Sequence, residues 1–413
     1  MSIRGCPTRR TALFLIYSLF LLSCGAGDSV PQGKKPDPII PDVSLYGKSG
    51  NRIARDLLAR SLELGTSFLL HNQKESGNFQ YEYNFVKRCY NPSDSQVRQT
   101  GALWELSLLH QNRLSEATSD ALVKGFEFFI EHSKETSEGS LYIVYPGDRV
   151  GRTGTVALMA LTLIDFLRSE DSFEEYPEYE AALVKYLDFL MSLRLSNGQF
   201  YKSYEYESGT GGGNPSPYFD GEILLALVKA RNHLDLRQWD GLLLESAEQM
   251  HRVHVDQARR QDPDSNATKG FYQWGSMAYF EIYQSDLPAK KEEYADWIID
   301  LVYWMIDEHR TLTRRRNTAY AYEGLICAWE LARLTGNAEA LQKIGDVIND
   351  VLYKLTSWQV GSPNQNASLL GNRSNDPKAI GGVMNHRKEA PLRIDVCQHQ
   401  MHAVILAMRN VYK

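Results

Sequence analysis

The segment Gly154-Thr-Val-Ala-Leu-Met-Ala-Leu161 is apolar on almost every side and opens on small residues. A helix of this composition has no face suited to water, so it must be surrounded by protein. Small residues at its start would let neighbouring helices approach closely. Five further segments share the pattern, and they begin at Gly101, Gly221, Gly275, Gly324 and His402. These segments predict the inner helices of the fold.

Amphipathic helices alternate with the inner segments. Each has an apolar stripe and a charged opposite face, as a helix on the outside of a protein needs. Their apolar positions lie within 53–68, 122–130, 183–190, 239–250, 294–305 and 341–355. The pattern recurs with a period of roughly fifty to sixty-five residues, which indicates repeated units. Because such repeats need capping or closure, we predict an all-α domain over 51–413, in which six helical hairpins close into an (α/α)6 toroid.

With this alternation, the chain resembles the (α/α)6 toroids of six-hairpin glycosidases, sugar epimerases and some polysaccharide lyases. The resemblance is architectural, so it implies carbohydrate chemistry only by analogy. Terpenoid cyclases and lanthionine synthetases have related toroids and remain alternatives. The zinc site of lanthionine synthetases has a Cys adjacent to a His, whereas Gln398 separates Cys397 from His399 here. We therefore expect no metal.

The N-terminus has the features of an export signal. Arg4, Arg9 and Arg10 precede an apolar run over 12–22, which ends in Leu21-Leu22-Ser23-Cys24. This ending resembles the lipobox of bacterial lipoproteins, which implies cleavage after residue 23 and a lipid on Cys24. The alternative is an ordinary signal peptide with a chance cysteine. The resemblance implies a bacterial cell-envelope protein, anchored by lipid to a membrane at its outer-membrane or periplasmic face, with 24–50 as a Pro-rich tether.

The predicted loops are asymmetric. Links from outer to inner helices are long, over about 72–98, 134–152, 195–219, 257–273, 309–318 and 357–397. They fall on one rim, at the N-termini of the inner helices, where helix dipoles favour anions. Four of them contain a Gly followed by aromatic or apolar residues in an extended pattern, at 77–81, 139–142, 198–201 and 270–272. These segments either line the rim, with Tyr81 toward a ligand, or form a structural turn.

The third inner segment contains the first candidate site, Pro217-Tyr-Phe-Asp-Gly-Glu222. Asp220 and Glu222 are the leading acid and base candidates, since glycoside hydrolysis commonly uses two carboxylates. The alternative for Asp220 is a helix N-cap. Tyr218 and Trp274 would stack on a sugar ring, because their flat faces suit one.

The sixth inner segment contains the second candidate site, Arg393-Ile-Asp-Val-Cys-Gln-His399. Asp395 and His399 are further catalytic candidates, because they alternate with Arg393 and Cys397 along a predicted extended approach. Arginines recur on the same rim. Arg98, Arg152 and Arg393 would hold a carboxylate through their planar guanidinium groups, so an acidic glycan is the expected ligand.

The composition restricts the function further. The net charge of −6 gives no support for nucleic-acid binding. The sequence has no serine-nucleophile elbow, phosphate loop or dinucleotide fingerprint, so we expect no cofactor. Two functions follow: a carbohydrate-active hydrolase, lyase or epimerase of the cell envelope, or a non-catalytic lipid-anchored module that binds a glycan or a protein there.

Overall fold

The computed structural model describes residues 53–169, 176–370 and 374–413, all of which belong to one compact unit spanning 40–413. The predicted signal, the lipidation site Cys24 and the tether lie outside the described residues. Within the described part of the chain, no helix combines the length and the apolar character that crossing a membrane requires.

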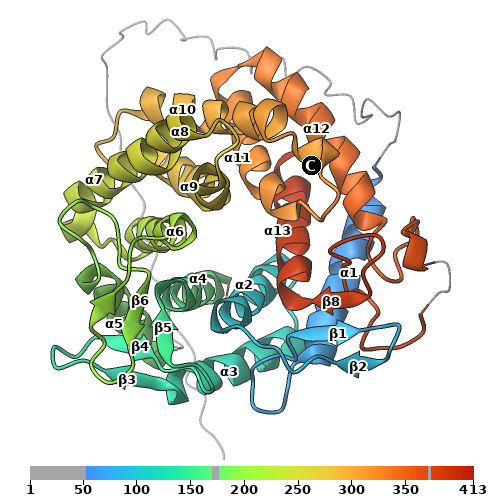
Figure 1. Ribbon diagram of the computed structural model, residues 1–413, viewed down its shortest axis with the longest axis horizontal. Helices are drawn as coiled ribbons and strands as arrows, with labels where there is room; N and C mark the ends of the chain where they lie inside the picture. The colour runs from blue at the N-terminus through green and yellow to red at the C-terminus, as the bar shows by residue number, and fades with distance from the viewer. Residues whose placement is uncertain (1–52, 170–175, 371–373) are drawn as a thin grey trace, which may run out of the picture. The chain divides into compact units, whose positions relative to one another are not determined.

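Long helices that are buried on most sides form the inner ring (Figure 1). They are α2 (Gln96–Asn112), α4 (Thr153–Ser169), α6 (Pro217–Leu234), α9 (Asn266–Gln284), α11 (Ala319–Thr335) and α13 (Ile394–Asn410). Each packs against the next, and α13 returns to pack against α2. The predicted closure of the ring is therefore confirmed.

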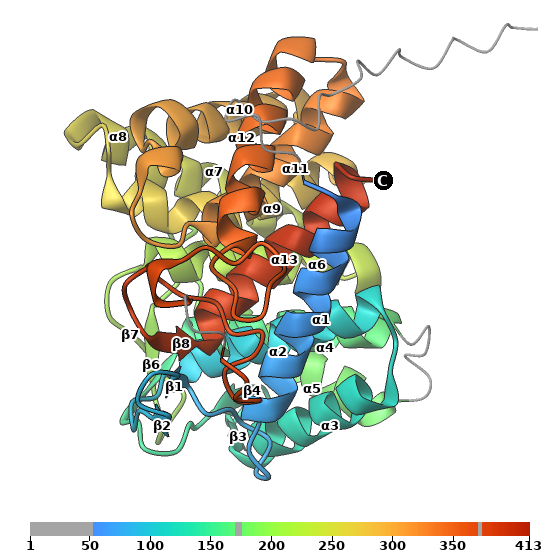
Figure 2. The same ribbon diagram turned by 90° about the vertical axis from the view of Figure 1, so that its right-hand side faces the viewer.

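The outer helices surround this ring. They are α1 (Arg55–Asn72), α3 (Glu116–Glu131), α5 (Pro177–Ser192), α7 (Asp240–His251), α10 (Lys291–Tyr303) and α12 (Ala338–Thr356). Figure 2 shows α1 running beside α13, so the first outer helix covers the last inner one. The alternation of outer and inner helices confirms the predicted (α/α)6 toroid.

Glycines near the starts of the inner helices allow neighbouring helices to approach each other closely, as predicted from the sequence. A Cβ atom on Gly221 of α6 would lie 2.5 Å from Trp274 Cβ on α9. A Cβ atom on Gly154 of α4 would overlap the carboxyl group of Glu222 on α6. Small residues at these points therefore leave the space that side chains of the next helix fill.

Short strands connect the rim loops. The strands β2 (Cys89–Tyr90), β1 (Glu82–Asn84) and β8 (Pro391–Arg393) form one sheet, which pairs the first long loop with the last. The strands β5 (Val150–Arg152), β6 (Ser203–Glu205) and β7 (Gly211–Gly212) form a second, and β3 (Ser133–Glu135) pairs with β4 (Leu141–Ile143). The two three-stranded sheets join loops of different hairpins, whereas β3 and β4 lie in one loop.

Two predicted extended segments are helical. A π-helix over Arg252–Gln257 and α8 (Ala258–Gln261) prolong the fourth outer helix, so the loop before α9 is short and 270–272 lies within α9. The helix α13 begins at Ile394, so the alternation predicted around Asp395 and His399 is wrong. A helical spacing of four still brings these two side chains to one face. Cys397, in contrast, is buried against Gly65 and Gly381.

The remaining Gly-containing segments are structural turns. Gly77, Gly139 and Gly198 have φ angles of 96°, 85° and 89°, a region that favours glycine. The following Phe79 and Phe200 are fully buried. The structural interpretation of these aromatics is thus confirmed for both phenylalanines.

Candidate functional site

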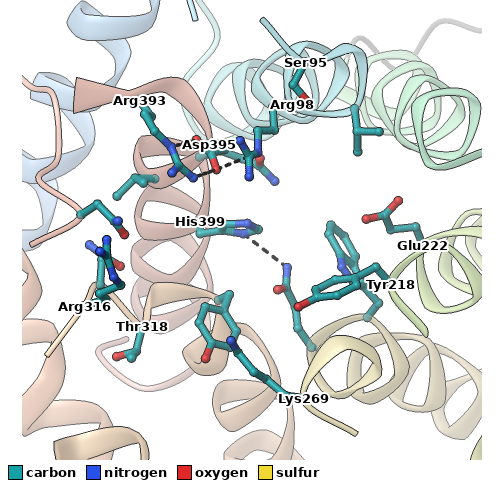
Figure 3. A pocket seen from close by; sticks show the side chains of 18 of the residues that line it. Ser95, Arg98, Tyr218, Glu222, Lys269, Arg316, Thr318, Arg393, Asp395 and His399 are labelled. Atoms are coloured by element: carbon teal, nitrogen blue, oxygen red, sulfur yellow. Dashed lines mark hydrogen bonds and ion pairs between the residues drawn. The ribbon is translucent and has the colours of Figure 1, made fainter. Parts of the chain in front are cut away.

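A cavity of about 1210 Å³ opens at the N-terminal ends of the inner helices. Side chains from all the inner helices line it, together with residues of the rim loops (Figure 3). The long loops predicted at the N-termini of the inner helices therefore marked the rim at which the cavity opens. Eight of the predicted site residues line the cavity: Arg98, Arg152, Tyr218, Glu222, Trp274, Arg393, Asp395 and His399. Asp220 and Tyr81 do not.

Glu222 is a buried acid directed at the cavity. Its side chain extends from α6 toward the space that His399 enters from α13 (Figure 3). The residue is 4% exposed, and its Oε2 has no hydrogen-bond partner among the described residues. Burial raises the pKa of the Glu222 carboxyl well above its ordinary value of 4.5. Glu222 is therefore better suited than an ordinary carboxyl group to hold a proton and donate it.

His399 is oriented by a buried carboxylate. Its Nδ1 lies 2.9 Å from Oε1 of Glu323 on α11, and Gln273 donates a 2.7 Å hydrogen bond to the other oxygen of Glu323. His402 lies 3.3 Å from the same carboxylate. Burial alone would raise the pKa of Glu323, but the charges of His402 and His399 lower it below its ordinary value. An ionised Glu323 accepts the Nδ1 proton of His399, which leaves Nε2 free to accept a proton in the cavity.

Asp395 is held between two arginines. Arg393 donates two hydrogen bonds to its carboxylate, one of them 2.9 Å long, and Nε of Arg98 lies 3.2 Å from Oδ2. Burial would raise the pKa of Asp395, but Arg393 and then Arg98 lower it. The hydroxyl of Tyr81 accepts a hydrogen bond from Arg98, and its ring is buried. In this cluster of four residues two arginines share one carboxylate and keep it ionised, so Asp395 is poorly suited to proton transfer.

Asp220 lies outside the cavity wall and anchors a rim loop. It is fully buried and accepts hydrogen bonds from the Phe200 amide at 3.0 Å and from the Gln199 side chain at 3.0 Å. Nε2 of His254, in the π-helix after α7, lies 2.7 Å from its carboxylate. The N-cap of α6 is Ser216, so the alternative N-cap role of Asp220 is wrong. On α2, Gln99 plays the corresponding part, because its amide group bonds both the N–H and the C=O of Phe79.

Aromatic side chains cover the α6–α9 side of the cavity. The Tyr218 ring is 46% exposed and packs against Gly270 of α9, where a Cβ atom would lie 2.8 Å from the ring. Trp274 also lines the cavity but is 3% exposed, with its ring tilted against Trp104 at 5.6 Å. Tyr218 therefore offers the larger face to a ligand.

The sequence analysis missed Glu323 and Gln273. Glu323 directly precedes Gly324, just as Asp220 precedes Gly221. An acid immediately before the small residue of an inner segment was the signal that could have found it. Gln273 had no such signal, because its neighbours in the sequence are aromatic.

Comparisons with known proteins find the fold but no family. No family model matches the chain, and no curated protein matches it in sequence. A family 76 α-mannanase from Bacteroides thetaiotaomicron is 12% identical, with 84% of this chain and 94% of that chain covered and a TM-score of 0.59. Cellobiose 2-epimerase from Spirochaeta thermophila is 15% identical, with coverages of 86% and 96% and a TM-score of 0.58.

An unsaturated glucuronyl hydrolase specific for heparin is 10% identical, with coverages of 86% and 98% and a TM-score of 0.55. At these identities the likeness concerns the fold alone. The chain thus has the (α/α)6 toroid fold that these carbohydrate-active enzymes have, as the architecture of its sequence predicted.

Proposed function

We propose that this protein is a carbohydrate-active enzyme that transfers protons to and from a sugar in the ring cavity. Glu222 is the general acid and His399 is the general base. The observation that carries the proposal is the pairing of a buried, unpartnered carboxyl group with an imidazole oriented by Glu323 across the same cavity. A buried carboxyl group with a strongly raised pKa in a cavity is typical of a functional site.

The roles follow from the geometry. Glu222 would protonate a sugar oxygen, because burial keeps its proton in place. Nε2 of His399 would remove a proton, and the carboxylate of Glu323 would stabilise the imidazolium that forms. Tyr218 would stack on the sugar ring and place it between the two groups.

The pairing of Glu222 with His399 suits elimination or epimerisation, whereas hydrolysis would require Asp94 or Asp148 as the second carboxylate. Hydrolysis by the common mechanism needs a second free carboxylate across the sugar. Among the described residues that line the cavity, Asp395 is bound by arginines, Asp264 by Arg314 and His309, and Asp94 and Asp148 by neutral donors. Glu222 alone in this described set has a buried oxygen without a partner.

The acidic substrate and the envelope location are part of the proposal. The cationic side chains of the lining support an anionic sugar. The lipobox at Cys24 supports anchoring to a bacterial membrane. Replacing Cys24 with Ala should abolish incorporation of a fatty-acid analogue during metabolic labelling. Equal labelling of the variant would contradict the anchor.

Proton exchange tests the activity directly. Incubation with a panel of reducing sugars, uronic acids and polyuronides in D2O should give deuterium incorporation or unsaturated products, detectable by NMR and ultraviolet absorbance. Glu222→Gln and His399→Gln should each reduce the rate by about a hundredfold to ten-thousandfold. Glu63→Gln and His71→Gln on the outer helix α1 are matched controls, and both should retain activity. Sugar binding without exchange or turnover in the wild type would favour the docking module instead.

A further inference from the structure

Most of the cations that line the cavity already have anionic partners. Arg98 and Arg393 both bind Asp395. Arg314 lies 2.8 Å from Asp264, and Arg316 lies 2.9 Å from Glu389. These arginines are therefore less available to a ligand carboxylate. Arg98 and Arg393, which were expected to hold such a carboxylate, bind Asp395 instead.

Arg152 lines the cavity from the end of β5, just before α4. Its side chain has no ion pair among the described residues. The Gln96 side chain accepts a 2.8 Å hydrogen bond from the backbone amide of Arg152. It also donates a 2.6 Å hydrogen bond to the carboxylate of Asp148. Asp94 lines the same cavity from the segment just before α2. The cavity lining before α2 and α4 therefore carries charges of both signs.

Lys269 and Arg315 share with Arg152 the lack of an anionic partner in the described part of the chain, but they lie at the start of α9 and just before α11. Both line the cavity, and within the described ranges neither charged group has an ion pair or a hydrogen bond. Lys269 is only partly exposed, and its ammonium lies over the ring of Tyr320, 5.6 Å from the centroid. Arg315 is exposed and lies between two arginines whose charges are engaged.

The position of Lys269 disfavours its positive charge, although Asp264 partly offsets this effect. Lys269 is in the first turns of α9, and Arg315 comes shortly before α11, so both lie near positive helix ends. Burial, and then the charge of Arg314, lower the pKa of Lys269 below its ordinary value of 10.5. An anion at this point would offset all of these effects. Glu222, nine-tenths buried and unpartnered in the same cavity, independently indicates that a ligand belongs there.

We propose that Lys269, whose ammonium lies over the ring of Tyr320, and Arg315, which lines the same cavity, form the subsite that holds an anionic substituent of the sugar. This inference rests on the proposed function and assigns the substrate class, a sugar bearing a carboxylate or a sulfate. The ammonium and the guanidinium would bind the anionic oxygens by charge-assisted hydrogen bonds. The sugar ring would then extend along α9 toward Tyr218 and Glu222.

Paired ligands test the subsite. Titration calorimetry would compare glucose, galactose and mannose with the corresponding uronic acids, and with glucose 6-sulfate to separate carboxylate from sulfate recognition. The wild type should bind one acidic sugar at least tenfold more tightly than its neutral counterpart. Lys269→Met keeps the aliphatic chain over Tyr320, and Arg315→Gln changes an exposed side chain. Each should reduce that preference by about tenfold or more.

Arg316→Gln is the matched control, because Arg316 is already paired with Glu389. This variant should keep the preference for acidic over neutral sugars. Equal binding of acidic and neutral sugars by the wild type would overturn this subsite but not the acid–base site. An unchanged preference in both Lys269→Met and Arg315→Gln, with unchanged melting temperatures, would also overturn it. Binding of no sugar at all would overturn the proposed function as well.

Discussion

Asp220 and Glu222 are two residues apart on α6, yet only one of them reaches the cavity. Successive positions two apart on a helix point in different directions, and the packing of α6 decides which direction meets the ring axis. The sequence could limit the candidates for the catalytic acid to Asp220 and Glu222, but it could not show which of the two faces the cavity. The same limit applies to Asp395. The sequence does not show that Arg98 and Arg393 both bind its carboxylate, and this contact decides whether it can transfer a proton.

Asp220 should matter for stability. Asp220→Ala leaves the donors of Phe200, Gln199 and His254 without their buried acceptor. We expect the free energy of unfolding to fall by about 3 kcal/mol. Asp220→Asn keeps one acceptor oxygen and should cost less. Urea denaturation followed by circular dichroism measures both. An Asp220→Asn variant with normal stability but no activity would show instead that Asp220 is catalytic.

Glu105 should make stability depend on pH. It is fully buried on α2, and neither carboxyl oxygen has a hydrogen-bond partner among the described residues. Burial, and then the charge of Glu323, raise the pKa of Glu105 well above its ordinary value of 4.5. The folded state thus keeps a proton that the unfolded chain releases, so wild-type stability declines as pH rises above about 4.5.

Glu105→Gln removes this dependence. Its stability relative to the wild type should increase with pH, by at most about 1.4 kcal/mol per pH unit, until the raised pKa is passed. Melting temperatures from pH 4 to pH 9 would measure the difference, with the exposed Glu63→Gln as control. A difference that stays constant with pH would contradict a protonated Glu105.

At the scale of elements, the glycines that open the inner helices serve the site as well as the packing. The Gly154 position on α4 leaves room for the Glu222 carboxyl group on α6. Gly154→Ala should displace that group and reduce turnover by about a hundredfold. Gly241→Ala on α7 is the matched control, because a Cβ atom there meets nothing within 4 Å. The control should gain about 0.5–1 kcal/mol of stability and keep its activity. Full activity of Gly154→Ala would contradict this role.

The helices could be predicted from the sequence because apolar periodicity reports burial directly. Their ends could not always be predicted. The fourth outer helix continues through a π-helix over Arg252–Gln257, and that bonding pattern leaves no mark in the periodicity. The extended segment predicted at 139–142 overlaps β4, but most rim strands were missed. Strands of two or three residues pair across loops far apart in the chain, as β1 does with β8.

At the scale of the whole molecule, the ring should behave as one unit. Deleting 50–110 removes α1 and most of α2, and thereby exposes the faces of α4 and α13 that α2 covers. We expect aggregation, because large apolar faces lose their neighbours. Size-exclusion chromatography and thermal melting would compare this truncation with the intact chain from residue 50 onward. A soluble truncated monomer with a sharp transition would contradict a closed ring.

The pairing of β1 with β8 also constrains how the chain reaches its native state. Glu82 of β1 pairs with Arg393 of β8, so this sheet cannot form until nearly the whole chain is present. The same holds for the hydrogen bond between Ser61 of α1 and Gln359, which are 298 positions apart. Closing so long a loop has a large entropic cost. A chain that emerges from a ribosome or a translocation channel N-terminus first would hold α1 without its last partner until α13 arrives. Amide protons at the β1–β8 seam should therefore gain protection last in pulse-labelled refolding.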